Sequence, residues 1–437
     1  MDVIVYPGRL AGTVKAPPSK SLAHRALICA ALTDGTSHIK GISGSKDMKA
    51  TIRCIEALGA SVKLDGDAAE VTGVYAGETP GACTGNEAEA GEGSVLCDCG
   101  ESGSTFRFIL PVASALGRKA RFTGEGKLPE RPVTPLADAM KAHGAVFLPD
   151  GRDHMPFEIE GKLQPGMYEI PGNISSQYIS GLLFALPLLD DDSRIVITGG
   201  LQSADYINLT TDMLAKFGIE SEKTDDGYLI RGGQHYQAAD VEVEGDYSNA
   251  AFWLVAGATG SDIKVTGLRL DSVQGDKRII EILDRMDAAI VADSEGIQAR
   301  GYTLSPVGVD CGNIPDLVPV LAVAACMTEE NAESRFTNAG RLRLKESDRL
   351  SSTASMLAKL GAGIQICGDE FSVFGSDGLE GGVMVDGFND HRIVMAAAVA
   401  ALRCYEPIKI TGAEAAAKSY PDFFDVFRSL GGRADVV

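Results

Sequence analysis

The 437-residue chain lacks an excess of positive charge: 60 acidic residues face 40 basic ones, and the net charge is −20. A surface with this balance excludes a general affinity for nucleic acids or acidic membranes. Long apolar runs are also missing, because the apolar stretches are about a dozen residues long and too short to span a bilayer. The N-terminal region shows no basic segment followed by an apolar run and a cleavage site, so we expect no signal peptide.

Cysteine is present but is not arranged as in disulfide-bonded or zinc-binding proteins. The nine cysteines are an odd number without regular spacing, which favours reduced thiols and a cytoplasmic location. The close pair Cys97 and Cys99 lacks further ligands at the spacing that zinc requires, and the six histidines show no such pattern. We interpret the pair as partly buried thiols and expect no metal site.

What the chain does contain is a two-part unit that recurs six times. The first part is an amphipathic stretch with apolar residues three and four apart, which ends at a glycine-type stop. This pattern predicts a helix with a left-handed C-cap. The stops are Gly59, Gly144, Gly218, Asp287, Gly361 and Gly431. They lie roughly 70–85 residues apart, so each unit is larger than a solenoid repeat.

The second part is a polar or glycine-rich start that runs into a helix of small apolar residues. Its copies lie in residues 18–28, 101–110, 174–184, 245–254, 315–322 and 389–396. A helix that is apolar on every side is buried, so we predict six interior helices. Each has unpaired N–H groups and about half a positive charge at its N-terminus, which attract anions where such termini converge. The repeat therefore predicts an anion-binding site.

Six units group most simply as three plus three, which predicts an α/β protein of two domains. The midpoint falls near residues 238–240, and we see no Pro- or Ser-rich linker there. Residues 3–6 are strand-like and precede the first unit, so this strand could complete the truncated last unit, whereas residues 87–92 are predicted to form a loop. We predict a discontinuous domain of residues 1–17 and 241–437, and a second domain of residues 18–240.

Basic clusters stand out against the acidic background. Residues 341–349 carry four cations, which could be a solvated helix face with Lys345 and Arg349 one turn apart. Cations also lie at or beside the starts of several predicted buried helices, namely Lys20, Arg25, Arg107 and Arg392. A solvent-facing role does not explain that placement, so we interpret these cations as parts of the anion site.

Seven motifs within these segments resemble those of the 5-enolpyruvylshikimate-3-phosphate (EPSP) synthase family, and they occur in the family's order over nearly the whole chain. They are PSKSLAHR at residues 18–25, GSTFR at 103–107, ERP at 130–132, SSQ at 175–177, LKESDR at 344–349, DHR at 390–392 and KSYP at 418–421. The resemblance implies an enolpyruvyl transferase fold, an inside-out α/β barrel. Each of two domains would have three βαβαββ units around buried helices, with the active site in the cleft between them.

The resemblance also implies the reaction. The family transfers the enolpyruvyl group of phosphoenolpyruvate to the 5-hydroxyl of shikimate 3-phosphate and releases phosphate, in the shikimate pathway to chorismate and aromatic amino acids. It uses no metal or organic cofactor, and its inhibitor is the phosphonate glyphosate, which is longer than phosphoenolpyruvate. Each substrate has a phosphate and a carboxylate, so together they bring roughly −5 to −6. We expect these two small anions to be the partners of a monomeric enzyme.

Site residues follow from the motifs. For shikimate 3-phosphate, the resemblance implies Lys20, Ser21, Arg25, Ser175, Ser176, Gln177, Ser203, Tyr206, Asp316 and Lys345. For phosphoenolpyruvate, it implies Lys20, Gly103, Arg131, Gln177, Arg349, Arg392 and Lys418. Arginine suits both anions because its fork is bidentate, and Gly103 would let backbone approach the ligand closely. Against these cations only Asp316 and Glu346 are counted as acids, which predicts an excess of positive charge in the empty site.

Addition of the hydroxyl requires one acid and one base within reach of adjacent atoms. We assign Asp316 as the base and Glu346 as the proton shuttle to the methylene carbon, with Lys20 and His391 as further catalytic residues. Each also has a structural interpretation: Ser175 and Ser176 as an N-cap pair, Asp316 as a partner of a helix dipole and His391 as a hydrogen bonder. Their joint occurrence at equivalent points of the repeat favours the catalytic interpretation.

Two departures from the family and two alternatives follow. Glu101 replaces a usual asparagine and would repel phosphoenolpyruvate unless it points away or pairs with an arginine, and Arg341 replaces another common asparagine.

The sister transferase acting on UDP-N-acetylglucosamine typically has a reactive cysteine five residues before Arg131, where this chain has Gly126. A non-catalytic anion-binding repeat scaffold is the second alternative, but it gives no reason for acids among the cations.

Overall fold

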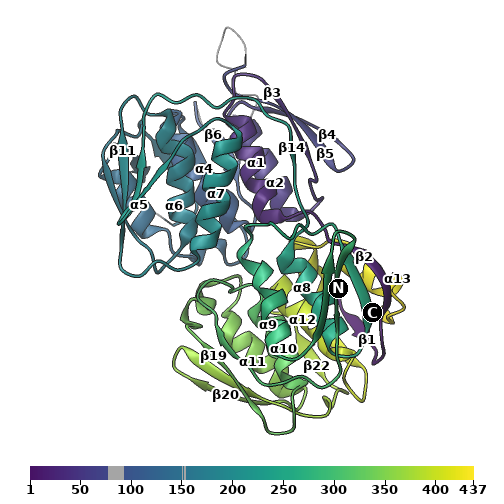
Figure 1. Cartoon of the computed structure of the whole chain (residues 1–437). Helices are drawn as coiled ribbons and strands as arrows, with labels where there is room; N and C mark the ends of the chain where they lie inside the picture. The colour runs from purple at the N-terminus through teal and green to yellow at the C-terminus, as the bar shows by residue number, and fades with distance from the viewer. Residues whose placement is uncertain (77–92, 150, 152–153) are drawn as a thin grey trace. The chain divides into compact units, whose positions relative to one another are not determined.

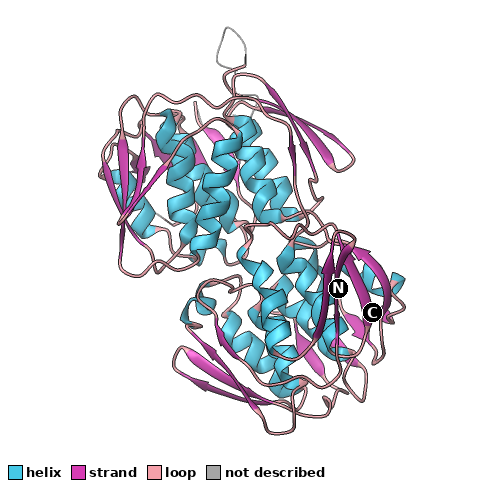
Figure 2. Ribbon diagram, in the orientation of Figure 1, coloured by secondary structure: helices cyan, strands magenta, loops and turns pink. Residues whose placement is uncertain are grey.

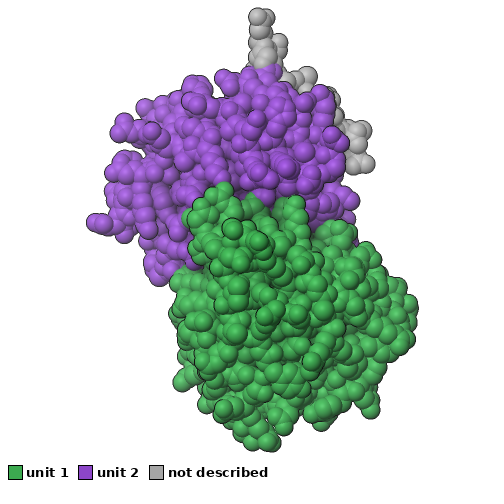
Figure 3. Space-filling view, turned by 45° about the vertical axis from the view of Figure 1, so that its right-hand side comes forward, with its two compact units in different colours: residues 1–18, 244–437 green, residues 19–243 purple. Residues whose placement is uncertain are grey.

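The computed structural model of the protein describes residues 1–76, 93–149, 151 and 154–437, so the loop predicted at residues 87–92 lies outside the described residues. The chain divides into two compact units, which Figure 3 colours separately. Unit 1 comprises Met1–Pro18 and Glu244–Val437, and unit 2 comprises Ser19–Val243.

The chain returns to unit 1 after Val243 rather than after residue 240. The reason is strand pairing: β14 (Val241–Glu242) runs parallel to β3 (Thr36–Lys40) of unit 2. The N–H of Val243 then donates to the carbonyl of Lys40 at 2.9 Å. These residues therefore extend a sheet of unit 2 before the chain leaves it.

The described residues of unit 2 form three four-stranded sheets with one common order. The first two strands of each sheet are parallel, and the remaining pairs are antiparallel. The first sheet contains β14, β3, β5 (Ala68–Thr72) and β4 (Ser61–Asp65). The second contains β6 (Val95–Asp98), β7 (Ala120–Thr123), β9 (Phe157–Glu160) and β8 (Val146–Leu148). The third contains β10 (Met167–Pro171), β11 (Ser193–Thr198), β13 (Gly227–Ile230) and β12 (Glu222–Thr224).

The helices of unit 2 fall into two sets, and Figure 1 shows α1, α4, α6 and α7 side by side. The buried set is α1 (Lys20–Ala31), α4 (Gly103–Ala115) and α6 (Ser176–Ala185). The set with one polar face is α2 (Lys46–Ala57), α5 (Thr134–Lys141) and α7 (Ala204–Lys216). Short 3₁₀ turns are η1 (Leu128–Glu130) and η2 (Leu186–Leu188). The apolar side chains of the buried set form the core of this unit.

Unit 1 repeats the same plan with three more sheets of the same order. They are β2 (Ala11–Lys15), β15 (Asp262–Thr266), β17 (Gly296–Arg300) and β16 (Ala289–Asp293); β18 (Gly308–Asp310), β19 (Glu333–Thr337), β21 (Glu370–Phe374) and β20 (Gly363–Cys367); and β22 (Met384–Asp386), β23 (Ile408–Thr411), β1 (Val3–Val5) and β24 (Ala434–Val436). The N-terminal strand β1 is antiparallel to both β23 and β24, so the last sheet uses both ends of the chain.

The buried helices of unit 1 are α8 (Tyr247–Ala258), α10 (Val318–Cys326) and α12 (His391–Ala401). The other helical segments are η3 (Gly275–Arg278), α9 (Ile279–Arg285), η4 (Gly340–Leu344), α11 (Arg349–Lys359), η5 (Ala413–Lys418) and α13 (Phe423–Ser429). In each unit, Figure 2 shows the strands outside the helices. The prediction of six interior helices in an α/β fold is confirmed.

The six predicted helix stops all have left-handed backbone. Their φ angles run from 62° at Asp287 to 111° at Gly59. Glycine reaches this region at little steric cost, and aspartate is one of the few other residues that does so. The predicted left-handed C-caps are therefore confirmed at every repeat, including the one that lacks glycine.

Cysteines in the described part of the chain are free thiols, and both Cys97 and Cys99 are buried. Those residues also contain no group of three or more His, Cys, Asp or Glu side chains arranged to hold a metal ion. No helix among them is long and apolar enough to cross a membrane.

Candidate functional site

In unit 2, the first turns of α4 and α6 are joined by side chains. The amide of Gln177 donates to the hydroxyl of Ser104 at 2.8 Å and accepts from Arg107 at 2.7 Å. Ser175 is the N-cap of α6, and its hydroxyl accepts from the N–H of Gln177. Ser175 therefore has the expected role of an N-cap. This cap fixes the first turn of α6, from which Gln177 contacts the start of α4.

Gly103 opens α4 where two arginine side chains come together. A Cβ atom at this position would lie 2.6 Å from a terminal nitrogen of Arg131 and 2.9 Å from one of Arg107. Only a residue without a side chain lets both guanidinium groups reach the helix start unshifted. Two cations at one helix N-terminus form a strongly anion-attracting point. The structure thus places Arg107, which the sequence assigned to the anion site but to neither ligand, beside Gly103.

Arg25 lies buried in α1, and protein acceptors hold its guanidinium group. It donates to the hydroxyl of Thr210 at 2.8 Å, and to the carbonyls of Ser21 and Tyr206 at 2.7 Å each. Burial lowers the pKa of Arg25 to about 10, so it remains charged at neutral pH. Tyr206 and Thr210 belong to α7, and Ser203 is the N-cap of this helix, with a left-handed φ of 57°. Tyr206 therefore contributes its backbone to the site by fixing Arg25.

Lys20 is paired with an acid that sequence motifs did not reveal. Its ammonium group lies 2.8 Å from Asp47, which is in the first turn of α2. The two side chains are only 14% and 13% exposed, so solvent screens this pair weakly. The pair holds the Lys20 side chain at the first turn of α1.

A buried polar chain connects α1 to the start of α4. His24 Nδ1 and the hydroxyl of Thr51 are 2.6 Å apart, and that hydroxyl is 2.7 Å from the hydroxyl of Thr105. Thr105 donates to Ser102, the N-cap of α4, at 2.7 Å. Burial, with Lys20 and Arg25 nearby, holds the pKa of His24 well below its usual value, so this imidazole is neutral. The chain fixes the Gly103 turn relative to α1.

In unit 1, Arg349 is the centre of a buried ion network. Its guanidinium group, 1% exposed, lies 3.0 Å from Asp390, 2.7 Å from Asp316 and 2.6 Å from Glu346. The two predicted catalytic acids thus share one arginine. Asp390 is also the N-cap of α12, and it fixes both that helix and Arg349. It is a second acid that the motif assignments did not include.

Arg392 lies in the first turn of α12 and bridges two other segments. It donates to Asp316 at 3.2 Å and to Asn249 of α8 at 3.3 Å. Its Nε is buried and has no hydrogen-bond acceptor among the described residues. Burial alone would raise the pKa of Asp316, but Arg392, Arg349 and Lys345 outweigh it and hold that pKa well below its usual range. Asp316 is therefore ionised throughout the neutral range.

Lys345 and Lys418 are the other two cations of unit 1 that the motifs assigned to the substrates. Burial, with Arg341 and Arg349 nearby, lowers the pKa of Lys345 to about 8, although Asp316 acts in the opposite direction. Lys418 is 3% exposed and donates to the carbonyl of Asn389 at 2.7 Å. That carbonyl lies just before the N-cap of α12, so Lys418 is held beside the same helix start as Arg392.

Histidine and glutamate positions of the motifs are also defined. His391 is buried, and its Nδ1 lies 3.9 Å from Asp390.

The carboxylate of Glu101 lies against Gly126, where an added Cβ would be 2.5 Å from a carboxylate oxygen. Gly126 also has a left-handed φ of 57°. The turn at Gly126 therefore has no space for a cysteine side chain without displacing Glu101.

The structure corrects the expected charge balance of the site residues. We counted only Asp316 and Glu346 against the cations, but Asp47 neutralises Lys20, and Asp390 neutralises part of Arg349. The excess of positive charge is therefore smaller than the motifs predicted. Sequence reasoning missed Asp47 because it lies outside the quoted motifs, and it missed Asp390 because only His391 and Arg392 of the DHR motif were assigned roles.

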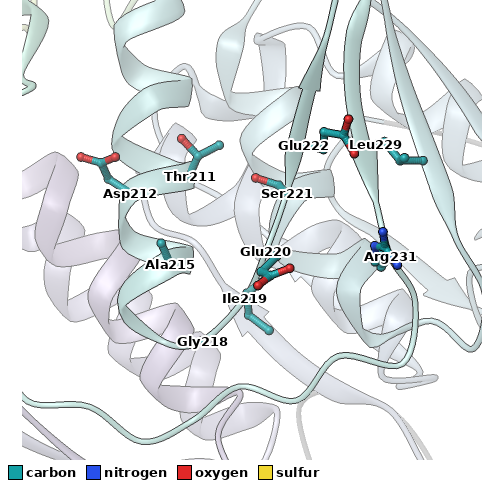
Figure 4. Close-up of a pocket in the computed structure, with 10 residues that line it drawn as sticks. All are labelled: Thr211, Asp212, Ala215, Gly218, Ile219, Glu220, Ser221, Glu222, Leu229 and Arg231. Carbon is teal, nitrogen blue, oxygen red and sulfur yellow. The ribbon is translucent and has the colours of Figure 1, made fainter.

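A surface hollow of about 670 Å³ in unit 2 lies apart from these residues. Figure 4 shows its lining between the last turns of α7 and the β12–β13 hairpin, with Asp212, Glu220 and Glu222 against a single arginine, Arg231. Carboxylates in this excess would repel a phosphate or carboxylate ligand. The hollow is therefore no candidate for binding the predicted anions.

Comparisons with solved structures define the class of fold. The structure of EPSP synthase from Acinetobacter baumannii matches with a TM-score of 0.81 at 24% identity, over 100% of both chains. The enolpyruvyl transferase NikO from Streptomyces tendae matches with a TM-score of 0.77 at 16% identity, over 99% of this chain and 98% of that one. At these identities the likeness shows the fold alone, and it is the fold of enolpyruvyl transferases.

Sequence comparisons define the family. A family model described as EPSP synthase (3-phosphoshikimate 1-carboxyvinyltransferase) matches residues 4–427. The 3-phosphoshikimate 1-carboxyvinyltransferase of Clostridioides difficile (strain 630) is 41% identical over 432 residues, which cover 99% of this chain and 98% of that protein. The protein of the same name from Clostridium acetobutylicum is 42% identical over 432 residues, which cover 98% and 97%. The chain belongs to the EPSP synthase family. The predicted family and class of enzyme are confirmed.

Proposed function

We propose that this chain transfers the enolpyruvyl group of phosphoenolpyruvate to the 5-hydroxyl of shikimate 3-phosphate, and that the clusters around Gly103 and Arg349 bind these two anions. The observation that carries the proposal is Arg392, a buried guanidinium group whose Nε–H has no acceptor among the described residues. Leaving such a group unpaired costs about 1–3 kcal/mol or more, and a phosphate or carboxylate oxygen would remove that cost.

Phosphoenolpyruvate is assigned to Lys20, Gly103, Arg131, Gln177, Arg349, Arg392 and Lys418, with Arg107 added. Shikimate 3-phosphate is assigned to Lys20, Ser21, Arg25, Ser175, Ser176, Gln177, Ser203, Tyr206, Asp316 and Lys345. In support, Gln177 is bonded to both Arg107 and Ser104, so one amide connects the helix starts assigned to the two ligands. Unit 2 therefore holds residues assigned to both ligands together at the starts of α4 and α6.

The proposed chemistry uses Asp316, which is ionised, beside Lys345, whose pKa is lowered to about 8. Asp316 accepts the proton of the 5-hydroxyl as oxygen bonds to the carbon that carries the phosphate ester. Glu346 delivers a proton to the methylene carbon, and Lys20 and His391 are the further catalytic residues. The new methyl group then returns a proton to Glu346, and the C=C bond re-forms as the electron pair of the breaking C–O bond leaves with phosphate. Lys418 and the arginines stabilise the charge of the departing phosphate. The low pKa of Asp316 makes it a weak base, and the charge of Lys345 beside it stabilises the hydroxyl oxygen as its proton leaves.

The assay that tests this function measures phosphate release from phosphoenolpyruvate with either of two acceptors. We expect release with shikimate 3-phosphate and none with UDP-N-acetylglucosamine, because Gly126 and the Glu101 carboxylate occupy the turn where the sister enzyme has its cysteine. Release with the nucleotide sugar alone would contradict the proposal. Ligand binding without release from either acceptor would favour the non-catalytic scaffold.

We further propose a cytoplasmic, monomeric enzyme. Eight cysteines in the described part of the chain are free, and seven of them are buried, which suits a reducing compartment. Sedimentation of the purified protein tests the monomer, and mass spectrometry after alkylation in cell extracts tests the reduced thiols.

Gly103→Ala is expected to raise the Michaelis constant for phosphoenolpyruvate by about tenfold, or roughly 1.4 kcal/mol. The added methyl group would meet Arg131 and Arg107 at under 3 Å and push their guanidinium groups away from the helix start. Inhibition by glyphosate should weaken more than substrate binding, because the longer ligand tolerates less displacement. Steady-state kinetics with and without glyphosate provide the measurement.

Gly44→Ala is the matched control, because a Cβ there would meet nothing within 4 Å and its φ is not left-handed. We expect this variant to keep both constants. If Gly103→Ala behaves like Gly44→Ala, Gly103 does not line the phosphoenolpyruvate site.

The apparent affinity for shikimate 3-phosphate is expected to decline above about pH 8. Lys345 has a lowered pKa of about 8, so it is charged below this pH and loses its charge as the pH rises through it. The value of kcat/KM, measured from about pH 6 to about pH 10, reports this ionisation in the free enzyme. In Lys345→Arg the decline should disappear, whereas Lys359→Arg, on the exposed face of α11, should keep it. A flat wild-type profile would remove Lys345 from the site.

A further inference from the structure

Unit 1 contains a buried carboxyl group that the proposed chemistry does not use. Asp276 lies in η3 and is 3% exposed. The hydroxyl of Ser248 in α8 donates to its Oδ2. Its Oδ1 is buried and has no hydrogen-bond partner among the described residues. A buried, half-satisfied carboxyl group is costly, so its presence calls for a functional explanation.

The segment that carries Asp276 is fixed to the first turn of α8. The N–H of Tyr247 donates to the side chain of Gln274 at 3.2 Å, and Gln274 donates to the carbonyl of Gly245 at 2.8 Å. Asp276 then contacts Ser248 one residue further along. Three positions at the start of α8, namely Gly245, Tyr247 and Ser248, are thus held by η3 and the residue before it.

The same turn of α8 contacts the anion site. Asn249 follows Ser248, and its side-chain oxygen accepts from Arg392 at 3.3 Å. Its side-chain nitrogen donates to Ser419, next to Lys418, at 3.0 Å. Asp276 is therefore connected to Arg392 through two neighbouring residues of one helical turn.

The charges around Asp276 come from three other segments. Asp316 before α10 and Asp246 at the N-cap of α8 repel its ionised form, and Arg392 of α12 attracts it. In its own turn, Lys277 donates to the carbonyl of Leu270, and Arg278 is exposed. Burial is the largest effect, and with Asp316 it raises the pKa of Asp276 to about 7. The side chains that α9 packs inward are apolar.

We propose that Asp276 is a positioning residue of the anion site, which acts through Ser248 and Asn249 to set how Arg392 is presented to phosphoenolpyruvate. This inference rests on the proposed function, in which Arg392 binds that substrate. When Asp276 is neutral, Arg392 keeps its ion pair with Asp316 and the attraction of Asp246, and it can bind the substrate. When Asp276 ionises, a further negative charge near Arg392 weakens the attraction of this guanidinium group for the substrate.

The test is Asp276→Asn, which keeps the size of the side chain but cannot ionise. In the wild type, the Michaelis constant for phosphoenolpyruvate should rise as the pH increases through about 7. In the variant this rise should be smaller. At pH 8.5 the Michaelis constant of the variant should be at least about threefold below that of the wild type, and at pH 6 the two constants should be similar. The Michaelis constant should change more than kcat, because Asp276 does not touch the reacting atoms.

Asp271→Asn is the matched control, because Asp271 lies in the same segment, is 72% exposed and pairs with Arg269 at the surface. It should keep the wild-type profile. If Asp276→Asn unfolds, as thermal melting would reveal, Ser248→Ala decides: a raised Michaelis constant for phosphoenolpyruvate supports the inference, and an unchanged one overturns it. A folded Asp276→Asn with the wild-type profile also overturns it. Absence of turnover in the wild type would instead be a failure of the proposed function.

Discussion

Arg349→Met is expected to abolish turnover and to lower the free energy of unfolding by about 3–5 kcal/mol. The guanidinium group is 1% exposed and has carboxylate partners in Asp390, Asp316 and Glu346. Methionine fills much of the same volume but removes the guanidinium group that these three acids share, although Asp316 keeps its contact with Arg392. These acids must then bind protons or move apart, and either change disorders the first turn of α12. Urea denaturation and the phosphate-release assay measure the two effects.

Arg335→Met is the control for the stability effect. Arg335 also forms an arginine–carboxylate pair, with Glu370 at 2.5 Å, but its side chain is 64% exposed. An exposed pair contributes about 0–1 kcal/mol, so this variant should unfold almost as the wild type does. Arg349→Lys keeps the positive charge but loses the bidentate guanidinium group. We therefore expect this variant to retain more of the wild-type stability than of the wild-type activity. Equal losses in Arg349→Met and Arg335→Met would show that the buried network does not stabilise unit 1.

The same network makes the free energy of unfolding depend on pH in the acidic range. The folded-state pKa of Asp316 is lowered, so its contribution is present above the unfolded value of about 4 and is lost as the pH falls below it. In Arg349→Met, the two-arginine environment of Asp316 is broken, and this part of the acid sensitivity should decrease.

Asp316→Asn and Glu346→Gln are each expected to reduce kcat by about a hundredfold or more. The amides keep the size of the acids but cannot accept or deliver the proton at the reacting atoms. Asp316 lies between Arg349 and Arg392, so its charge also orients both cations. Glu346 forms an ion pair with Arg349, which is assigned to phosphoenolpyruvate, at 2.6 Å. Binding of shikimate 3-phosphate should therefore survive in Glu346→Gln and weaken in Asp316→Asn.

The control for these variants is Glu330→Gln, because Glu330 is exposed beyond the end of α10. It should keep wild-type kcat. Single-turnover phosphate release separates the chemical step from product release, and titration calorimetry measures binding of shikimate 3-phosphate. Near-normal kcat in both acid variants would remove Asp316 and Glu346 from the proton transfers.

The sequence alone determined the features that depend on neighbours along the chain. The helix stops were readable because a left-handed C-cap needs glycine or, as at Asp287, a residue that tolerates positive φ. The buried helices were readable because residues such as those of α10 are apolar on every side. The cation motifs were readable because their members lie within one or two turns of each other, as Lys345 and Arg349 do.

Only the tertiary structure decided which acids and hydroxyls those cations meet. Lys20 with Asp47, Arg349 with Asp390 and Arg107 with Gln177 join residues from 27 to 70 positions apart. Asp276 has no motif of its own and gains its role from Ser248, 28 residues away. A single carboxylate or hydroxyl has no periodicity, so its position along the chain does not indicate its partner. The fold supplies that partner when it buries both groups in one medium of low dielectric, where an unpaired charge is too costly to persist.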